Sequence, residues 1–168
     1  MSLRLLLIRH GLSSYNLESR IQGRNDLSTL TDEGITQASK AGEALKGLYI
    51  NSIYTSPLKR AADTAKEIIN INDGSNIILD NDLLEVDLSP WTGLTIEEVK
   101  HKFPEAYKIW KESPYELSLL RNDGSRYRPI AELMVQAENF LKKIYFLALS
   151  LLDMEKQTGI KKGAFRDK

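Results

Sequence analysis

Short apolar segments alternate with helical patterns through the first half of the chain, and this alternation restricts the fold more than any other feature of the sequence. Residues 3–8, 52–56 and 76–80 are short apolar or β-branched runs, and each predicts a strand. Between them, residues 35–48 and 61–69 carry apolar side chains at helical spacing. Strands separated by helices pair in parallel and are covered on both faces. The order of elements therefore predicts an α/β fold whose first strand, 3–8, is buried.

Capping residues and a proline predict where several helices begin and end. Thr29 or Thr31 is placed to cap the helix that contains Ile35. Thr95 and Glu98 have the spacing of a capping box, which predicts a helix that starts just after Thr95. Pro104 ends that helix and begins another one, because proline is tolerated only in the first turn.

The second half of the chain is more helical and contains one long irregular connection, residues 113–129. A connection of this length is often one that covers a functional site. A long helix is expected to begin near Ile130 and to present one apolar face, which is made of Leu133, Ala137, Leu141 and Ile144. The apolar segment 144–152 either extends this helix or supplies a further strand. No linker or repeat divides the chain, so we expect one domain, 1–168, in which 152–168 is a frayed tail.

Composition excludes several kinds of site. Lysine plus arginine and aspartate plus glutamate each number 23, so no overall field attracts nucleic acid or an anionic membrane. The absence of cysteine excludes thiol nucleophiles and thiolate metal centres, and two histidines are too few for a histidine-rich metal site. No apolar run approaches the roughly 20 residues of a membrane span. We expect a cytoplasmic protein that uses no metal or cofactor and binds neither nucleic acid nor membrane.

Polar residues that suit phosphate chemistry follow the predicted strands. Ligands of open parallel sheets bind beyond the carboxyl ends of the strands. Arg9 and His10 follow the first strand, Asn16 lies in the next loop, Arg60 follows the second strand and Glu85 the third. Guanidinium groups match phosphate oxygens with a planar fork of donors, and a carboxyl group is able to protonate a leaving alkoxide. These residues are therefore candidates for one phosphate-binding crevice.

Each of these residues also has a simpler explanation when it is taken alone. An arginine at a helix start, such as Arg60, is more often a solvated surface residue, and Glu85 is equally suited to pair with a lysine. His101 stands between Lys100 and Lys102 on an amphipathic segment, and we expect it at the surface. Only the joint pattern favours a shared site.

Four motifs in the sequence resemble, in order and spacing, those of the histidine phosphatase superfamily, the phosphoglycerate-mutase-like group. The motifs read LIRHGLSSYN, RIQGRNDLSTLTDEGITQA, IYTSPLKRAADTA and LLEVDLSPWTGLTIEEV. The resemblance runs from the start of the chain to about residue 100 and continues more weakly to about Ile144. It implies a three-layer α/β/α fold with a mostly parallel central sheet.

The resemblance also assigns a role to each candidate phosphate-binding residue. His10 matches the nucleophile that accepts the phosphoryl group. Arg9 and Arg60 match the arginines that hold the phosphoryl oxygens, and Asn16 matches a further phosphate ligand. The implied chemistry is covalent catalysis, in which one displacement is divided into two.

Two further residues match positions around the leaving group. Gly23 matches a loop glycine that lines the substrate entrance, and Glu85 matches the acid that protonates the leaving group and then activates water. The implied activity is that of a phosphatase or phosphotransferase acting on a small phosphorylated metabolite. We favour a phosphatase over a mutase because no long insertion is present to enclose a transferring intermediate.

One residue of the family pattern is missing from this sequence. The family carries a second histidine on a late strand beside the first strand, whereas the residues after Ile144 contain none, and His101 comes too early to replace it. We therefore expect a C-terminally incomplete version of the fold, whose uncovered strand edge favours homo-oligomers. Three alternatives follow: an active phosphatase or phosphotransferase acting on small phosphomonoesters, an inactive relative that only binds phosphorylated ligands, or an unrelated α/β binding module. In the first case the missing segment predicts that activity is low.

Overall fold

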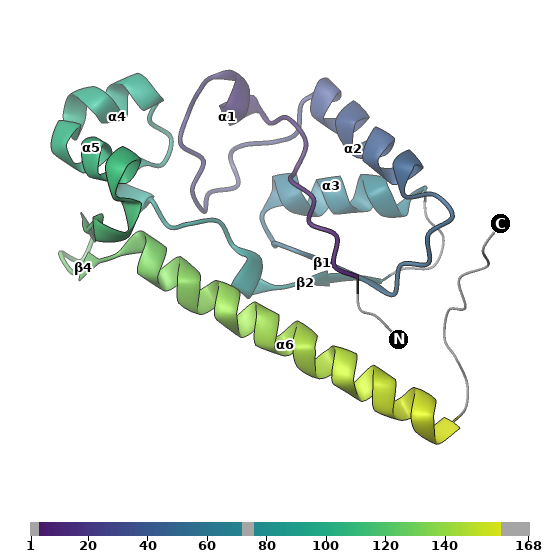
Figure 1. The fold of residues 1–168 in the computed structure, drawn as a ribbon. Helices are drawn as coiled ribbons and strands as arrows, with labels where there is room; N and C mark the ends of the chain where they lie inside the picture. The colour runs from purple at the N-terminus through teal and green to yellow at the C-terminus, as the bar shows by residue number, and fades with distance from the viewer. Residues whose placement is uncertain (1–3, 72–75, 159–168) are drawn as a thin grey trace.

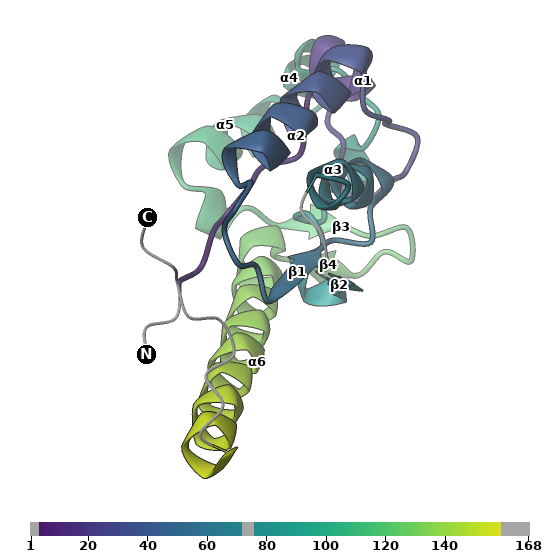
Figure 2. The same cartoon turned by 90° about the vertical axis from the view of Figure 1, so that its right-hand side faces the viewer.

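The computed structural model describes residues 4–71 and 76–158 and contains a small parallel sheet between two helical layers (Figure 1). The helices and strands, in chain order, are α1 (Ser14–Leu17), α2 (Asp32–Ala44), β1 (Ser52–Thr55), α3 (Lys59–Ile69), β2 (Asn76–Leu79), η1 (Asn81–Leu83), η2 (Ser89–Trp91), α4 (Ile96–Lys102), α5 (Pro104–Glu112), η3 (Pro114–Glu116), β3 (Leu119–Leu120), β4 (Arg126–Tyr127) and α6 (Pro129–Thr158). β1 and β2 pair in parallel from Ser52 opposite Asn76 to Thr55 opposite Leu79. Figure 2 shows α3 and α2 above this sheet and α6 below it. The predicted α/β class is confirmed.

Local sequence signals predicted the helix ends well. The Thr31 side chain accepts a hydrogen bond from the Gly34 amide at the start of α2. Thr95 and Glu98 exchange the two bonds of a capping box at the start of α4. Pro104 is the first residue of α5. The two threonine caps satisfy amides that the helix itself leaves unpaired, whereas proline at a first helical position has no amide to satisfy.

Residues 4–8 are not a strand, and this corrects the prediction of a buried first strand. The segment has no regular secondary structure, and its apolar side chains are exposed, that of Leu7 to 86%. A strand exists only where a neighbour exchanges backbone hydrogen bonds with it. In the described sheet, β1 and β2 pair only with each other.

The connection 113–129 is more ordered than predicted. It contains η3 and an antiparallel hairpin in which β3 pairs with β4. Its apolar side chains join the main core cluster, which consists of Val86, Leu88, Trp91, Val99, Leu117, Leu119 and Tyr127. The connection thus stabilises the second half of the chain through core packing and is not a loose cover over a site.

The predicted apolar face of α6 is confirmed in part: Leu133 packs against the main core cluster and Ile144 is half-buried, whereas Ala137 is exposed. Phe140 is buried and meets Tyr54 of β1 edge-to-face, with ring centroids 5.7 Å apart, whereas Leu141 is 56% exposed. The contact with β1 thus adds Phe140 to the buried side of the helix. Residues 144–152 extend α6 and do not form a strand. The expected tail overlaps the end of α6, which continues to Thr158, and 159–168 lie outside the described residues.

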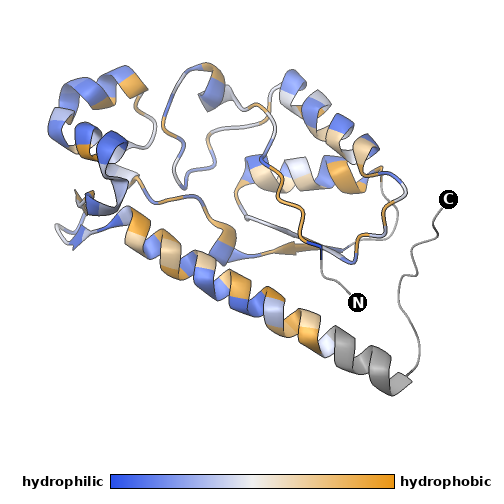
Figure 3. Ribbon diagram, in the orientation of Figure 1, coloured by the Kyte–Doolittle hydropathy of each residue, from blue (hydrophilic) through white to orange (hydrophobic). Residues whose placement is uncertain are grey.

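Apolar residues remain visible along much of α6 in Figure 3. Within residues 4–71 and 76–158, however, no helix combines the length and the apolar character that crossing a membrane requires.

Candidate active site

His10 lies in the turn that follows the N-terminal segment, and its ring is half-buried. Its Nδ1 is 2.7 Å from the carbonyl oxygen of Gly11. A carbonyl only accepts hydrogen bonds, so Nδ1 carries the proton that it donates there. In the neutral ring, Nε2 then holds the free lone pair. The geometry therefore presents His10 as a nucleophile or base through Nε2.

The surroundings of His10 favour the neutral imidazole. Burial lowers the pKa of His10 below its ordinary value, and the hydrogen bond to the Gly11 carbonyl opposes this shift. The positive charges of Arg60 and Arg9 lower the pKa further, whereas the carboxylate of Glu85 raises it. The predicted residues Arg9, Arg60 and Glu85 therefore all act on His10, although they come from three separate segments.

Arg60 is buried, contrary to the alternative that it is a solvated surface residue. It lies in the first turn of α3 and is 1% exposed. Its guanidinium donates to the carbonyl oxygen of Gly23 at 2.9 Å and to that of Asn25 at 3.1 Å. Burial lowers the pKa of Arg60, and the charges of Glu85 and Asp26 oppose that shift. A guanidinium has five N–H donors, so these two bonds orient the group and leave donors for an anion.

Gly23 is required at its position for two geometric reasons. Its φ angle is +53°, which glycine adopts at little cost, and a Cβ atom there would lie 2.4 Å from the Thr92 side-chain oxygen. This conformation aims the Gly23 carbonyl at Arg60. Gly23 also lines a hollow of about 210 Å³ together with Glu85.

Thr64 connects α3 to the segment that carries His10. Its hydroxyl oxygen accepts a hydrogen bond from the Gly11 amide at 3.1 Å and donates to the carbonyl oxygen of Arg60 at 2.8 Å. Thr64 is 5% exposed and lies one turn after Arg60 on α3. Sequence reasoning missed this residue. The only signal was a small polar side chain on the same helix face as Arg60.

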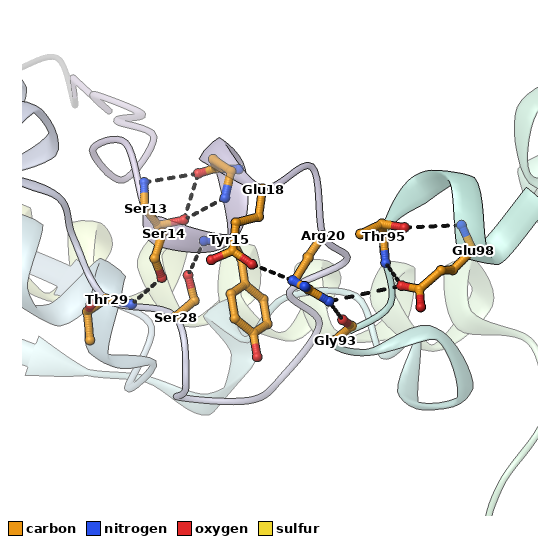
Figure 4. A network of polar contacts seen from close by, with 11 residues as sticks. Ser13, Ser14, Tyr15, Glu18, Arg20, Ser28, Thr29, Gly93, Thr95 and Glu98 are labelled. Carbon is orange, nitrogen blue, oxygen red and sulfur yellow. Dashed lines mark hydrogen bonds and ion pairs between the residues drawn. The ribbon is translucent and has the colours of Figure 1, made fainter.

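Asn16 is held within its own turn by Ser13. The Asn16 side-chain oxygen accepts bonds from the amide and the hydroxyl of Ser13, at 3.3 and 2.8 Å, and closes the capping box of α1. These bonds engage the side-chain oxygen of Asn16, so its NH₂ group is the donor that the predicted role of a phosphate ligand requires. The next loop is held by a hydrogen bond from the Thr29 amide to the Ser14 hydroxyl oxygen at 3.4 Å (Figure 4). A backbone bond from the Ser14 amide to the Thr29 carbonyl oxygen at 2.9 Å reinforces it.

Gln22 joins these two loops inside the protein, and sequence reasoning did not identify it. Ser13 and Ser28 are both fully buried. The Ser28 hydroxyl donates to the Gln22 side-chain oxygen at 2.9 Å, and the Ser13 hydroxyl, whose one proton is shared with Asn16, lies 2.9 Å from the same oxygen. A buried hydroxyl is costly unless it is bonded, so this arrangement specifies how the loops fit together.

Glu85 is exposed, and its loop is anchored by residues that the sequence did not single out. Arg24 donates to the Glu85 carbonyl oxygen at 2.8 Å and to the Gln136 side-chain oxygen at 2.7 Å. The Gln136 amide in turn donates to the Leu84 carbonyl oxygen at 2.9 Å. The loop that carries Glu85 is thus attached to α6.

The remaining candidates lie at the surface. Arg9 is exposed and contributes its charge to His10, whereas His101 is exposed on α4, as expected. Across the part of the chain that the structure describes, no group of three or more histidine, cysteine, aspartate or glutamate side chains is placed to hold a metal ion.

Comparison with known proteins gives a consistent result. The family model described as "Histidine phosphatase superfamily (branch 1)" matches residues 5–144. The chain is 42% identical over 136 residues to "Probable 2-carboxy-D-arabinitol-1-phosphatase" of Arabidopsis thaliana, which covers 81% of this chain and 27% of that protein. It is 30% identical over 141 residues to "Phosphoserine phosphatase 1" of Hydrogenobacter thermophilus, covering 84% of this chain and 64% of that one.

Solved structures resemble the fold as well. "Bacillus stearothermophilus YhfR" has a TM-score of 0.71 at 29% identity and covers 81% of this chain and 64% of its own. A mycobacterial glucosyl-3-phosphoglycerate phosphatase in complex with VO3 has a TM-score of 0.67 at 27% identity and covers 81% of this chain and 64% of its own. The chain therefore spans between about a quarter and two thirds of the length of these relatives.

Proposed function

The chain belongs to the histidine phosphatase superfamily, and from this premise we propose that it hydrolyses phosphomonoesters of small metabolites through a phosphohistidine at His10. One observation carries the proposal. A half-buried imidazole, with Nδ1 tied to a carbonyl, stands within the field of the buried guanidinium of Arg60, and Thr64 bonds to the backbone of both segments. This arrangement suits a neutral nucleophile directed at an anionic substrate.

The first step transfers the phosphoryl group to the protein. The Nε2 lone pair of His10 forms a bond to phosphorus while the bond to the ester oxygen breaks. The electron pair of that bond moves to the departing oxygen, which takes a proton from the acid form of Glu85. Arg9 and Arg60 stabilise the negative charge on the phosphoryl oxygens.

The second step regenerates the free enzyme. The Glu85 carboxylate takes a proton from water, the water oxygen attacks phosphorus, and the bond between phosphorus and Nε2 breaks. Inorganic phosphate leaves and His10 returns to the neutral form. The lowered pKa of His10 favours this form as both the nucleophile and the leaving group.

A second candidate function is binding of phosphorylated ligands without turnover. It is supported by the position of His101, the other histidine of the sequence, which is exposed on α4 and belongs to no part of the site. The site described here thus contains one histidine, whereas the family pattern has two. Loss of one preorganised donor to a transition-state oxygen lowers a rate by about 10²–10³. Arg9, Arg60 and Asn16 would still hold a phosphate group.

One experiment separates these functions. The protein is incubated with an aryl phosphate and a panel of sugar and hydroxy-acid phosphates, and phosphate release, phosphohistidine by mass spectrometry, and thermal stabilisation are measured. Turnover with label on His10 supports the phosphatase, and it should persist in a His101→Ala control. Stabilisation without turnover supports the binding function, because a ligand of the native state raises its melting temperature. A protein that shows neither effect contradicts both.

A further inference from the structure

A hollow of about 210 Å³ lies next to the proposed site. Its lining residues are Arg20, Ile21, Gln22, Gly23, Glu85, Val86, Leu88 and Trp110. Two of them belong to the site already described: Gly23, whose carbonyl holds Arg60, and Glu85, whose charge acts on both His10 and Arg60. The hollow and the phosphate site therefore adjoin each other at Glu85.

The position of Glu85 shows what this hollow would contain. If Glu85 protonates the departing ester oxygen, that oxygen lies within hydrogen-bond reach of its carboxyl group. Phosphorus lies on the His10 side of this oxygen, so the carbon part of the substrate extends to the other side. The space available there is the hollow that Glu85 lines.

One wall of the hollow is apolar and held firmly in place. Val86 and Leu88 belong to the core cluster, and Trp110 packs against it. The Trp110 ring meets the fully buried Trp91 edge-to-face, with centroids 6.2 Å apart and planes at 86°. Fixed aromatic and aliphatic surfaces favour an apolar or ring-shaped group. A cavity of about 150 Å³ suffices for a benzene ring, so this hollow has room for one ring.

The cation at the hollow is already paired. Arg20 donates to a Glu18 carboxylate oxygen at 2.5 Å and to the Gly93 carbonyl at 2.8 Å, and Glu98 lies 4.0 Å away (Figure 4). The remaining charged residue of the lining is Glu85, an acid, and Lys102, whose charge acts on Glu98, is not part of the lining. A second negative charge on a substrate would therefore face a carboxyl group without meeting an unpaired cation among the described lining residues.

We infer that this hollow selects phosphomonoesters of neutral, ring-containing alcohols over esters that carry a second anionic group. The inference rests on the proposed function, because it takes His10 and Glu85 as the groups that flank the ester bond. It names Trp110 and Arg20 as the residues that determine specificity. It also argues against a mutase that transfers phosphate between two anionic intermediates.

Two methylene analogues, which cannot be hydrolysed, test this selection by titration calorimetry. Benzylphosphonate replaces phenyl phosphate, and 3-phosphonopropionate replaces phosphoglycolate, with inorganic phosphate as the common reference. We expect benzylphosphonate to bind at least about tenfold more tightly than 3-phosphonopropionate. Trp110→Ala should abolish most of the preference for benzylphosphonate over inorganic phosphate, whereas Trp110→Phe should retain that preference. Ile109→Ala, an exposed neighbour outside the hollow, is the matched control.

A double variant, Glu18→Gln with Glu98→Gln, tests the pairing of Arg20. It should strengthen 3-phosphonopropionate binding by at least about threefold, because it removes the carboxylates that neutralise Arg20. Glutamine at residue 98 preserves the capping box of α4.

The outcomes separate two failures. A protein that does not bind inorganic phosphate overturns the proposed function itself. A protein that binds inorganic phosphate but gives equal affinities for the two analogues, or prefers 3-phosphonopropionate, overturns the selection at the hollow and leaves the proposed function standing.

Discussion

The loops around His10 and the outer surface of α6 are built in opposite ways. Around His10, polar groups are buried and bonded: Ser13 and Ser28 are fully buried, and Arg60 is 1% exposed. On α6, apolar side chains face outward, and Tyr145 and Phe146 are 61% and 66% exposed. Figure 3 shows how apolar residues recur along α6.

This difference shows what holds each region in place. Buried polar groups are tolerated only when they find their partners, so the loops around His10 have few alternative arrangements. Exposed apolar groups place no such demand on geometry, because removing them from water is favourable against any apolar surface. Hydrogen bonds therefore determine the geometry of the loops around His10, whereas no such bonds determine what packs on the outer face of α6. The following changes test this contrast, beginning with the largest expected effect.

Replacing His10 with alanine should abolish turnover and leave the fold intact. The side chain supplies the proposed nucleophile but is only half-buried, and its one described hydrogen bond is to the adjacent residue. We expect a loss of at least about 10³ in rate, measured as phosphate release from an aryl phosphate, with an unchanged melting temperature. Turnover within about tenfold of the parent protein would rule out the covalent mechanism.

Replacing Arg60 with alanine should weaken both binding and folding. The change removes a charge-assisted contact to phosphate, which corresponds to a loss of about 1.5–3 kcal/mol in binding free energy. It also leaves the carbonyl groups of Gly23 and Asn25 without this donor. Calorimetric titration with inorganic phosphate and chemical denaturation measure the two effects. Unchanged phosphate affinity would remove Arg60 from the site.

Replacing Gly11 with alanine should destabilise the loop that carries His10. The added Cβ would lie 2.2 Å from the carbonyl oxygen of Gly34, so backbone must shift, at a cost of about 1–3 kcal/mol. Gly42→Ala in α2 is the comparison and should cost less. Its nearest contact is the flexible end of Ile71 at 2.9 Å, the nearest backbone atom, of Ile68, is 3.2 Å away, and alanine favours the helix by up to about 1 kcal/mol. Equal unfolding free energies for the two variants would show that the loop is not tightly packed.

Lowering the pH below about 6.5 should destabilise the protein through His10. Because its pKa in the folded protein lies below the ordinary value, the unfolded chain takes up the proton first as the pH falls, and folding is disfavoured from that point downward. Above that range both states are neutral and the effect vanishes. Denaturation of the parent and of His10→Gln across pH 5–8 should show less loss at low pH in the variant. An identical pH dependence would contradict a lowered pKa.

Replacing Leu141 or Tyr145 with lysine should have the smallest effect on stability. Both side chains are more than half exposed, so the unfolding free energy should change by no more than about 0.5 kcal/mol. The same changes should reduce self-association in sedimentation velocity, because they interrupt an exposed apolar surface. A loss of about 2 kcal/mol or more would show that this face is covered in solution.

The sequence by itself determined the elements whose signals are short-range. Thr31 and the capping box of Thr95 and Glu98 predicted where α2 and α4 begin, because a cap depends on residues only three positions apart. The sequence also led to the prediction that His10 and Arg60 lie near each other. The charge of Arg60 does act on His10, although the strand that was expected to precede His10 does not form.

The tertiary structure decided what depends on a distant partner. Residues 4–8 are as apolar as a buried strand, yet they form none, because a strand requires a neighbour and not only a composition. The contact with β1 adds Phe140 to the buried side of α6. The links of Thr64 to Gly11 and of Gln136 to Arg24 join residues 53 and 112 positions apart. No local pattern encodes such pairs, because each side chain has many bonding partners of the same chemistry until the fold brings one of them within reach.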